Sequence, residues 1–275
     1  MGSARAGVPH LLVLHGLEGT VRAKYAHGLL AEARTRGWSG DLLLFRSCDG
    51  ELNTAPRLYH SGETSDLDFI VRRFAVQSPS SPLVICGVSL GGNVLLKWLG
   101  DAGAAAATLV ARAAAVSVPY DLAAGSRYLE RGISPLYTKH FLATLKPKAL
   151  RKALQRPDLL RADRILVART FWEFDDAATA PLHGFDDAAD YYAKSSSLFV
   201  LHQVRVPTLL FGAHDDPFVP KSVVHAAVER AQESPSLKCE FTVRGGHVGW
   251  VEGQPFFSKY YMERRVVDYL SKLAV

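Results

Sequence analysis

The feature of this sequence that most restricts its fold is a series of short apolar segments, each followed by a helical pattern. Such segments lie at 11–15, 42–46, 83–88, 113–118, 208–213 and 239–243. Most are apolar throughout rather than alternating, which is typical of strands buried on both faces of a sheet. The crossovers that parallel strands require are supplied by helical patterns at 21–36, 65–77, 90–101, 221–232 and 257–273. The sequence therefore predicts an α/β fold with a doubly wound, mainly parallel sheet of about six strands.

One interval breaks this rhythm. About ninety residues separate the segment ending near Val118 from the one starting near Pro207, and a crossover needs far fewer. The interval is mostly helical in pattern, so we expect an inserted helical unit. The predicted organisation is a core formed by 1–120 and 204–275, with a helical lid at 121–203.

The predicted lid is rich in basic residues. Between positions 136 and 170 the basic residues are Lys139, Lys146, Lys148, Arg151, Lys152, Arg156, Arg161, Arg164 and Arg169, against the acidic Asp158 and Asp163. A solvated outer face is the ordinary explanation for such a charge run. The alternative is a surface for peripheral contact with an anionic membrane or substrate.

Composition excludes several classes of protein. Apolar residues make up 48% and charged residues 21% of the 275 residues, as in soluble globular proteins. A net charge of +5 from 32 basic and 27 acidic residues is a mild excess, and we expect no nucleic-acid partner. Three cysteines without a CxxC spacing favour structural thiols over a disulfide framework or a zinc site. With no long apolar run and no export signal, a cytoplasmic location is expected.

The strand at 83–88 leads into a G-x-S-x-G motif, Gly87-Val88-Ser89-Leu90-Gly91. A serine between a buried strand and a helix sits on a sharp turn, where side chains at the flanking positions would strike neighbouring backbone. This arrangement is a nucleophile elbow, and it makes Ser89 the candidate nucleophile.

A serine nucleophile needs a base, and the base needs a carboxylate to orient it. Asp215 follows the strand at 208–213, and His247 lies on a glycine-rich loop after the last predicted strand. The order Ser, Asp, His along the chain is that of the α/β hydrolases. We therefore predict a triad of Ser89, Asp215 and His247. Asp216 is the neighbouring alternative for the acid, and Asp215 is preferred for its position at the strand end.

Acyl transfer also requires hydrogen-bond donors for the developing oxyanion. The backbone N–H after the nucleophile belongs to Leu90, at the start of a helix whose dipole favours negative charge. The second donor is expected in the loop after the first strand, where "HGLEG" (15–19) lies, and we assign it to Leu17. His15 is interpreted as a structural hydrogen-bonding residue.

Several ordered blocks together resemble one known family. They are "HGLEGT" (15–20), "FRSCDGELNTAPRLYHSGETSDL" (45–67), "GVSLGGNVLLKWLGD" (87–101), "SVPYDL" (117–122), "DDAATAPLHGFDDAADYY" (175–192), "VPTLLFGAHDDPF" (206–218) and "GGHVGW" (245–250). From residue 11 to the last helix, the chain is similar to the AB-hydrolase-4, or YheT-like, family of α/β hydrolases.

The resemblance implies a carboxylesterase whose charge-relay residues match Ser89, Asp215 and His247, with acylglycerols or phospholipids among the substrates of some members. Relatives usually carry a longer N-terminal region, so we expect six strands here instead of eight and carry over no membrane anchor. The block "YHSGET" (59–64) belongs to the resemblance but has no evident catalytic part. For His60 within it, substrate binding, packing and capping all stay open.

These observations predict a serine hydrolase that cleaves small-molecule acyl esters, including lipid esters, through an acyl-enzyme. No metal or organic cofactor is implied. Two alternatives stay open: a thioesterase using the same triad, and a binding or scaffold protein that keeps the fold with little chemistry.

Overall fold

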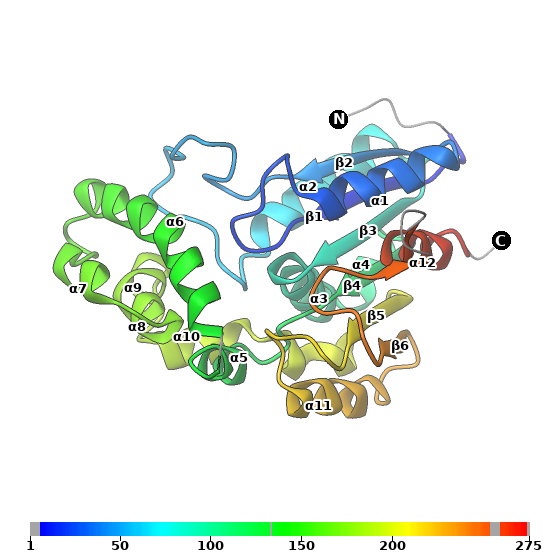
Figure 1. The fold of residues 1–275 in the computed structure, drawn as a ribbon. Coiled ribbons are helices and arrows are strands. Elements are labelled where there is room, and N and C mark those ends of the chain that lie inside the picture. The colour runs from blue at the N-terminus through cyan, green and yellow to red at the C-terminus, as the bar shows by residue number, and fades with distance from the viewer. Residues whose placement is uncertain (1–5, 133, 254–258, 274–275) are drawn as a thin grey trace.

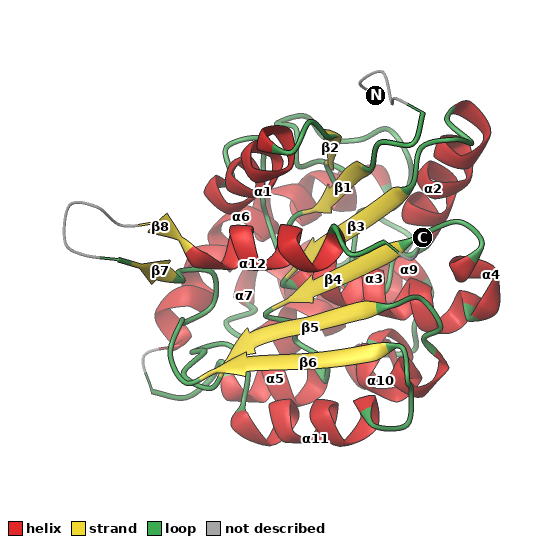
Figure 2. Ribbon diagram, turned by 90° about the vertical axis from the view of Figure 1, so that its right-hand side faces the viewer, coloured by secondary structure: helices red, strands yellow, loops and turns green. Residues whose placement is uncertain are grey.

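The computed structural model describes residues 6–132, 134–253 and 259–273. Its centre is a sheet of six parallel strands in the order β2-β1-β3-β4-β5-β6 (Figures 1 and 2). The strands are β1 His10–Leu14, β2 Ser39–Leu43, β3 Leu83–Val88, β4 Arg112–Val116, β5 Thr208–Ala213 and β6 Leu237–Thr242. The predicted parallel α/β sheet is confirmed. Strands β1, β3 and β5 are buried along their whole length, which explains their continuous apolar sequences.

Helices cover both faces of the sheet. On one face, side chains of α1 (Lys24–Thr35) and α12 (Tyr261–Leu270) form a core cluster with the strands, and Figure 2 shows α12 crossing in front of them. On the other face lie α2 (Ser65–Gln77), α3 (Leu90–Ala102) and α11 (Lys221–Ala231). The short helix α4 (Ala104–Ala107) follows α3, and a small hairpin of β7 (Val251–Glu252) and β8 (Lys259–Tyr260) precedes α12.

The predicted helix at 257–273 corresponds to α12, and its first two residues lie outside the described residues. None of the helices described in the structure combines the length and apolar character needed to cross a membrane.

Between β4 and β5 the chain forms a group of helices set apart from the sheet, on the left in Figure 1. In order they are α5 Leu122–Tyr128, α6 Ser134–Gln155, α7 Ala162–Val167, α8 Phe171–Phe174, the π-helix η1 Asp175–Thr179, α9 Ala180–His183, α10 Ala188–Ser195 and the 3₁₀-helix η2 Ser197–Gln203. Much of this group packs around its own apolar cluster, which includes Leu142, Ile165 and Phe174. We keep the name lid for residues 121–203.

The last segment of the lid packs differently from the rest. Leu198 and Leu201 of η2 belong to the same cluster as α3 and the sheet rather than to the cluster of the lid. From about Ser197 onward, the chain therefore packs against the core rather than against the rest of the lid.

Candidate active site

Ser89 lies at the carboxyl end of β3, at the turn into α3. Its backbone angles are φ +54° and ψ −120°, a left-handed conformation that non-glycine residues rarely adopt. Such strain costs on the order of 1–3 kcal/mol and is held only by the surrounding structure. Here the Ser89 N–H donates to Val116 O on the next strand, at 2.8 Å. The predicted elbow is the observed local geometry.

The flanking glycines are required by backbone contacts. A Cβ atom on Gly91 would lie 2.5 Å from His15 O and 2.6 Å from Leu14 O, and one on Gly87 would strike the Gly91 carbonyl. These obstacles are backbone atoms, which cannot move aside without displacing β1 or α3. The spacing in the motif is therefore a packing requirement of the turn that carries Ser89.

Ser89, His247 and an aspartate form one hydrogen-bonded chain. His247 Nε2 lies 2.9 Å from Ser89 Oγ, and His247 Nδ1 lies 2.8 Å from Asp216 Oδ2. In this hydrogen-bonded series, His247 Nδ1–H donates to Asp216 and His247 Nε2 accepts from the Ser89 hydroxyl. A general base requires this arrangement. The His247 ring also packs edge-on against Phe218, with ring centroids 4.5 Å apart.

The predicted acid, Asp215, is corrected by this geometry to Asp216. After β5 the chain turns, with Asp216 N–H donating to Ala213 O at 3.4 Å, and the turn directs the buried Asp216 side chain inward. Asp216 Oδ1 accepts from Phe218 N at 2.8 Å, which fixes the carboxylate. Asp215 instead accepts from Gly245 N and Gly246 N, at 2.9 and 2.8 Å. It shapes the loop that carries His247 without contacting the imidazole.

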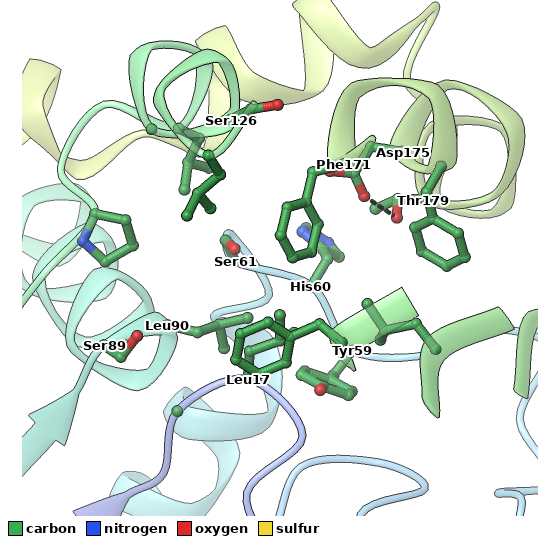
Figure 3. A pocket seen from close by; sticks show the side chains of 18 of the residues that line it. Leu17, Tyr59, His60, Ser61, Ser89, Leu90, Ser126, Phe171, Asp175 and Thr179 are labelled. Carbon is green, nitrogen blue, oxygen red and sulfur yellow. Dashed lines mark hydrogen bonds between the residues drawn. The ribbon is translucent and has the colours of Figure 1, made fainter. Parts of the chain in front are cut away.

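The two predicted oxyanion donors lie beside Ser89. The amides on either side of Leu17 are engaged, because Gly16 N donates to Tyr25 Oη and Glu18 N donates to Tyr59 Oη, each at 2.8 Å. Within the part of the chain that the structure describes, neither Leu17 N nor Leu90 N has a protein acceptor. Leu17 and Leu90 both line the cavity in front of Ser89 (Figure 3). Their assignment as oxyanion donors stays a prediction.

The loop that carries Leu17 is held from two sides. His15 is fully buried, its Nδ1 donating to Gly16 O at 2.7 Å and its Nε2 accepting from Phe45 N at 3.0 Å. Burial lowers the pKa of His15, which agrees with a neutral imidazole that has one donor and one acceptor. The structure thus places His15 in the structural role expected for it.

Glu18 connects the same loop to the lid. Its φ of +55° turns the chain sharply after Leu17, and its carboxylate Oε1 accepts from Tyr59 Oη and from Lys148 Nζ on α6, both at 2.8 Å. The exposed fractions are 24% for Lys148 and 9% for Glu18, so this ion pair is shielded from bulk water. A lid residue therefore fixes the residue next to a predicted oxyanion donor.

A cavity of about 360 Å³ separates Ser89 from the lid. Its wall is mainly apolar. The apolar and aromatic lining residues include Leu17, Tyr25, Leu58, Tyr59, Val88, Leu90, Pro119, Leu122, Leu129, Phe141, Leu145, Phe171, Phe174, Ala178, Leu182, Tyr191, Tyr192, Phe218 and Val248. Ser89 and His247 open into this space, so an acyl chain placed here would reach the Ser89 hydroxyl.

The block "YHSGET", for which the sequence suggested no role, connects the lid to α3. Asn93, one turn after Ser89 and fully buried, donates to Ser61 O and Ser195 O at 2.8 Å each. Its Oδ1 accepts from Ser197 N at 3.0 Å, and Ser61 N donates to Tyr191 Oη at 3.0 Å. Gly62 packs directly on Ser195, which leaves no room for a Cβ atom. Such distant pairings are invisible in the sequence.

His60 and His183 line the cavity, and with Glu63 they form a cluster whose candidate metal-ligating atoms lie within 4.8 Å of one another. Burial lowers the pKa of His60 well below its ordinary value and that of His183 to about 4, so both are neutral near pH 7. However, His60 Nδ1 accepts from Gly62 N at 3.1 Å, which places the ring proton on Nε2. Glu63 is already bound by Arg57 and Ser65. This donor set matches a hydrogen-bonded cluster better than a metal site.

The basic lid does not present all its charge outward. Lys152 is fully buried and donates to Asn53 O, Ala55 O and Gln155 Oε1, and Lys146 donates to Leu166 O. Three arginines pair with acids in the ion pairs Arg156–Asp158, Arg161–Asp163 and Arg164–Asp176. A solvated outer face therefore does not describe Lys148 and Lys152, because poorly exposed acceptors of the core bind their ammonium groups.

The cysteines are free thiols. Cys48 and Cys86 are buried and Cys239 is partly buried. Burial raises the pKa of Cys48 to about 11, and desolvation likewise raises the pKa of Cys86. Neither is activated as a nucleophile, which leaves Ser89 as the residue with an adjacent base.

Comparisons with known proteins identify relatives of this chain. A family model described as Hydrolase_4, serine aminopeptidase, S33, matches residues 60–247. YheT of Escherichia coli K12 is 38% identical over 266 residues, covering 96% of this chain and 76% of YheT. The mouse protein named Phospholipase ABHD3 is 31% identical, covering 89% of this chain and 59% of that protein.

Among solved structures, the Pyrococcus furiosus esterase Pf2001 has a similar fold, with a TM-score of 0.60 at 15% identity, over 96% of this chain and 83% of that one. This likeness supports the fold alone. The sequence relatives and the family model show more: the chain belongs to the AB-hydrolase-4, or YheT-like, family of α/β hydrolases.

Proposed function

We propose that this protein is a serine hydrolase that cleaves carboxylic esters of apolar acyl groups through an acyl-enzyme. The observation that carries the proposal is the unbroken chain Ser89–His247–Asp216, whose serine end faces an apolar cavity. Relatives named as a phospholipase and, in yeast, as a monoacylglycerol lipase support an ester substrate with a fatty acyl part.

In the first half-reaction, Ser89 Oγ attacks the ester carbonyl while its proton passes to His247 Nε2. The N–H groups of Leu17 and Leu90 bind the oxyanion of the tetrahedral intermediate, and Asp216 stabilises the imidazolium at Nδ1. The C–O bond to the alcohol then breaks, and the alcohol leaves with the proton from Nε2. In the second half, water gives a proton to His247 and attacks the acyl-serine ester, which releases the acid and restores Ser89.

The test compares single variants in hydrolysis of a p-nitrophenyl ester chain-length series and in labelling by a fluorophosphonate. Ser89→Ala is expected to lose both. Asp216→Asn should lower kcat by up to about 10⁴-fold, the loss typical when the triad carboxylate becomes an amide. Asp215→Asn is a matched control, since it makes the same chemical change at the neighbouring residue. Its effect on kcat should be far smaller, because it alters only the contacts of Asp215 with Gly245 N and Gly246 N.

A large loss in Asp215→Asn with little loss in Asp216→Asn would refute the assignment of the acid. A folded wild-type protein that neither hydrolyses the esters nor reacts with the fluorophosphonate would favour a binding or scaffold role. A thioester reacts through the same steps, so a parallel series of acyl thioesters decides between esterase and thioesterase.

A further inference from the structure

One part of the cavity wall is polar although the proposed reaction uses none of its groups. It is formed by Ser126 on α5, Asp175 and Thr179 on η1, and Tyr192 on α10, all of which line the cavity. Thr179 Oγ1 donates to Asp175 Oδ1 at 2.5 Å, and Tyr192 Oη donates to Asp175 Oδ2 at 2.7 Å. Tyr192 Oη lies 3.3 Å from Ser126 Oγ. We call these four residues the polar wall.

The polar wall lies away from the catalytic serine. In Figure 3, Ser89 and Leu90 are at one side of the cavity, Asp175 and Thr179 are at the other, and His60 and Ser61 lie between. A ligand that occupied the cavity from end to end would meet the nucleophile at one part and the Asp175 carboxyl group at another.

The backbone beneath the wall is unusual. Asp175–Thr179 is a π-helix between the short α-helices α8 and α9. Single turns of π-helix are rare in proteins as a whole. Where they do occur, they are frequently found at functional sites. This turn brings Asp175 and Thr179, four residues apart, into direct contact on the cavity side.

Among the described residues, no cationic side chain pairs with Asp175. The adjacent Asp176 pairs with Arg164, at 2.7 Å, whereas Asp175 forms no ion pair within the residues that the structure describes. His60 and His183, which line the same cavity, are neutral near pH 7 because burial lowers their pKa values. Each Asp175 oxygen accepts one internal hydrogen bond and keeps capacity for another.

We propose that Asp175 anchors a second recognition point in the cavity, where its carboxyl group accepts a hydrogen bond from a hydroxyl or ammonium group of the ester substrate. The proposal rests on the proposed function and adds a preferred substrate class to it. An ionised carboxylate only accepts hydrogen bonds, so its partner must be a donor. A partly buried acceptor paired in this way also selects against substrates that lack the donor, because part of its hydrogen-bonding capacity is then left unused.

The experiment measures kcat/KM for matched esters that differ only in a donor group. The acyl-side set is p-nitrophenyl hexanoate, 6-hydroxyhexanoate and 6-aminohexanoate, and the alcohol-side pair is butyl and 4-hydroxybutyl hexanoate. The quantity compared is the ratio of each donor-bearing ester to its plain counterpart. In one of the sets this ratio should be at least about tenfold higher for wild type than for Asp175→Ala.

The variants separate the chemical sources of the donor. Asp175→Asn keeps one carbonyl acceptor without charge, so it should retain part of a preference for hydroxyl but lose a preference for ammonium. Asp176→Asn is the matched control, since that carboxylate pairs with Arg164 and is not among the residues lining the cavity. Its ratios should equal those of wild type.

Two results would overturn the recognition point. One is an active enzyme whose ratios are the same in wild type and Asp175→Ala. The other is an equal loss for all esters together with a lowered melting temperature, which would make Asp175 only a structural residue of the lid. Fluorophosphonate labelling of Ser89 in each variant separates these results from failure of the proposed function, in which wild type itself is neither labelled nor active.

Discussion

Replacing Asp175 by asparagine should stabilise the fold at neutral pH. Burial raises the pKa of Asp175 from its ordinary value of 3.8 to about 6, against the opposing hydrogen bonds from Thr179 and Tyr192. A shift of roughly two units, at about 1.4 kcal/mol per unit, means that the ionised side chain costs the folded state up to about 3 kcal/mol above pH 6.

The sign follows from proton linkage. A carboxyl group with a raised pKa in the folded state holds its proton there when the unfolded chain has already lost it. Wild-type stability relative to the asparagine variant therefore falls as pH rises from about 4 to about 6, and is constant above that range. Part of the gain will be offset, because the asparagine amide cannot accept from both Thr179 and Tyr192 as the carboxylate does. We expect a net gain of about 1–2 kcal/mol at pH 7.5.

The assay is urea-induced unfolding of wild type and Asp175→Asn at pH 4, 5, 6 and 7.5, followed by circular dichroism. The difference in unfolding free energy should grow across this range in favour of asparagine. A variant that is less stable than wild type at pH 7.5, or a difference independent of pH, would refute the reasoning. Asp176→Asn serves as the control, since its exposed pairing with Arg164 contributes little.

Three further changes probe the framework of the site. Gly91→Ala should destabilise the fold by about 2 kcal/mol or more in urea unfolding, since its Cβ would lie 2.5 Å from His15 O, whereas Gly125→Ala, with no atom within 4 Å, should be neutral or stabilising. Lys148→Met should lower kcat by about tenfold, because Glu18 beside the Leu17 amide would lose its ion pair. Lys148→Arg should restore much of the lost kcat. An unchanged kcat in Lys148→Met would contradict a link between this ion pair and the Leu17 amide. Lys152→Met should cost about 3 kcal/mol in thermal or urea unfolding, because Asn53 O and Ala55 O lose a buried donor, and a cost below about 0.5 kcal/mol would contradict this account.

The sequence predicted those parts of the molecule that depend on local pattern. Continuous apolar runs located all six strands within a few residues, and the glycines around Ser89 identified the elbow, because both features follow from contacts between neighbouring elements. The positions of Ser89 and His247 after their strands were enough to predict that they meet, and the structure brings them within 2.9 Å.

The identity of the aspartate that contacts His247 could not be predicted from the pattern. Asp215 and Asp216 both follow the same strand, and only the direction of one turn decides which carboxylate faces His247. A possible signal was the pair Asp216-Pro217, since residues before proline are restricted in conformation. The burial of Lys152 could not be predicted from the sequence either, because its acceptors lie about a hundred residues earlier in the chain.

Asn93 joins one part of the lid to the core. Its side chain holds the start of the "YHSGET" block and the end of α10 against the helix that begins after Ser89. A displacement of α10 would have to separate these buried amide contacts next to Ser89. A movement of the lid that left the strained geometry of Ser89 intact would therefore have to keep α10 in place, and in α6 it would meet the further core contacts of Lys148 and Lys152.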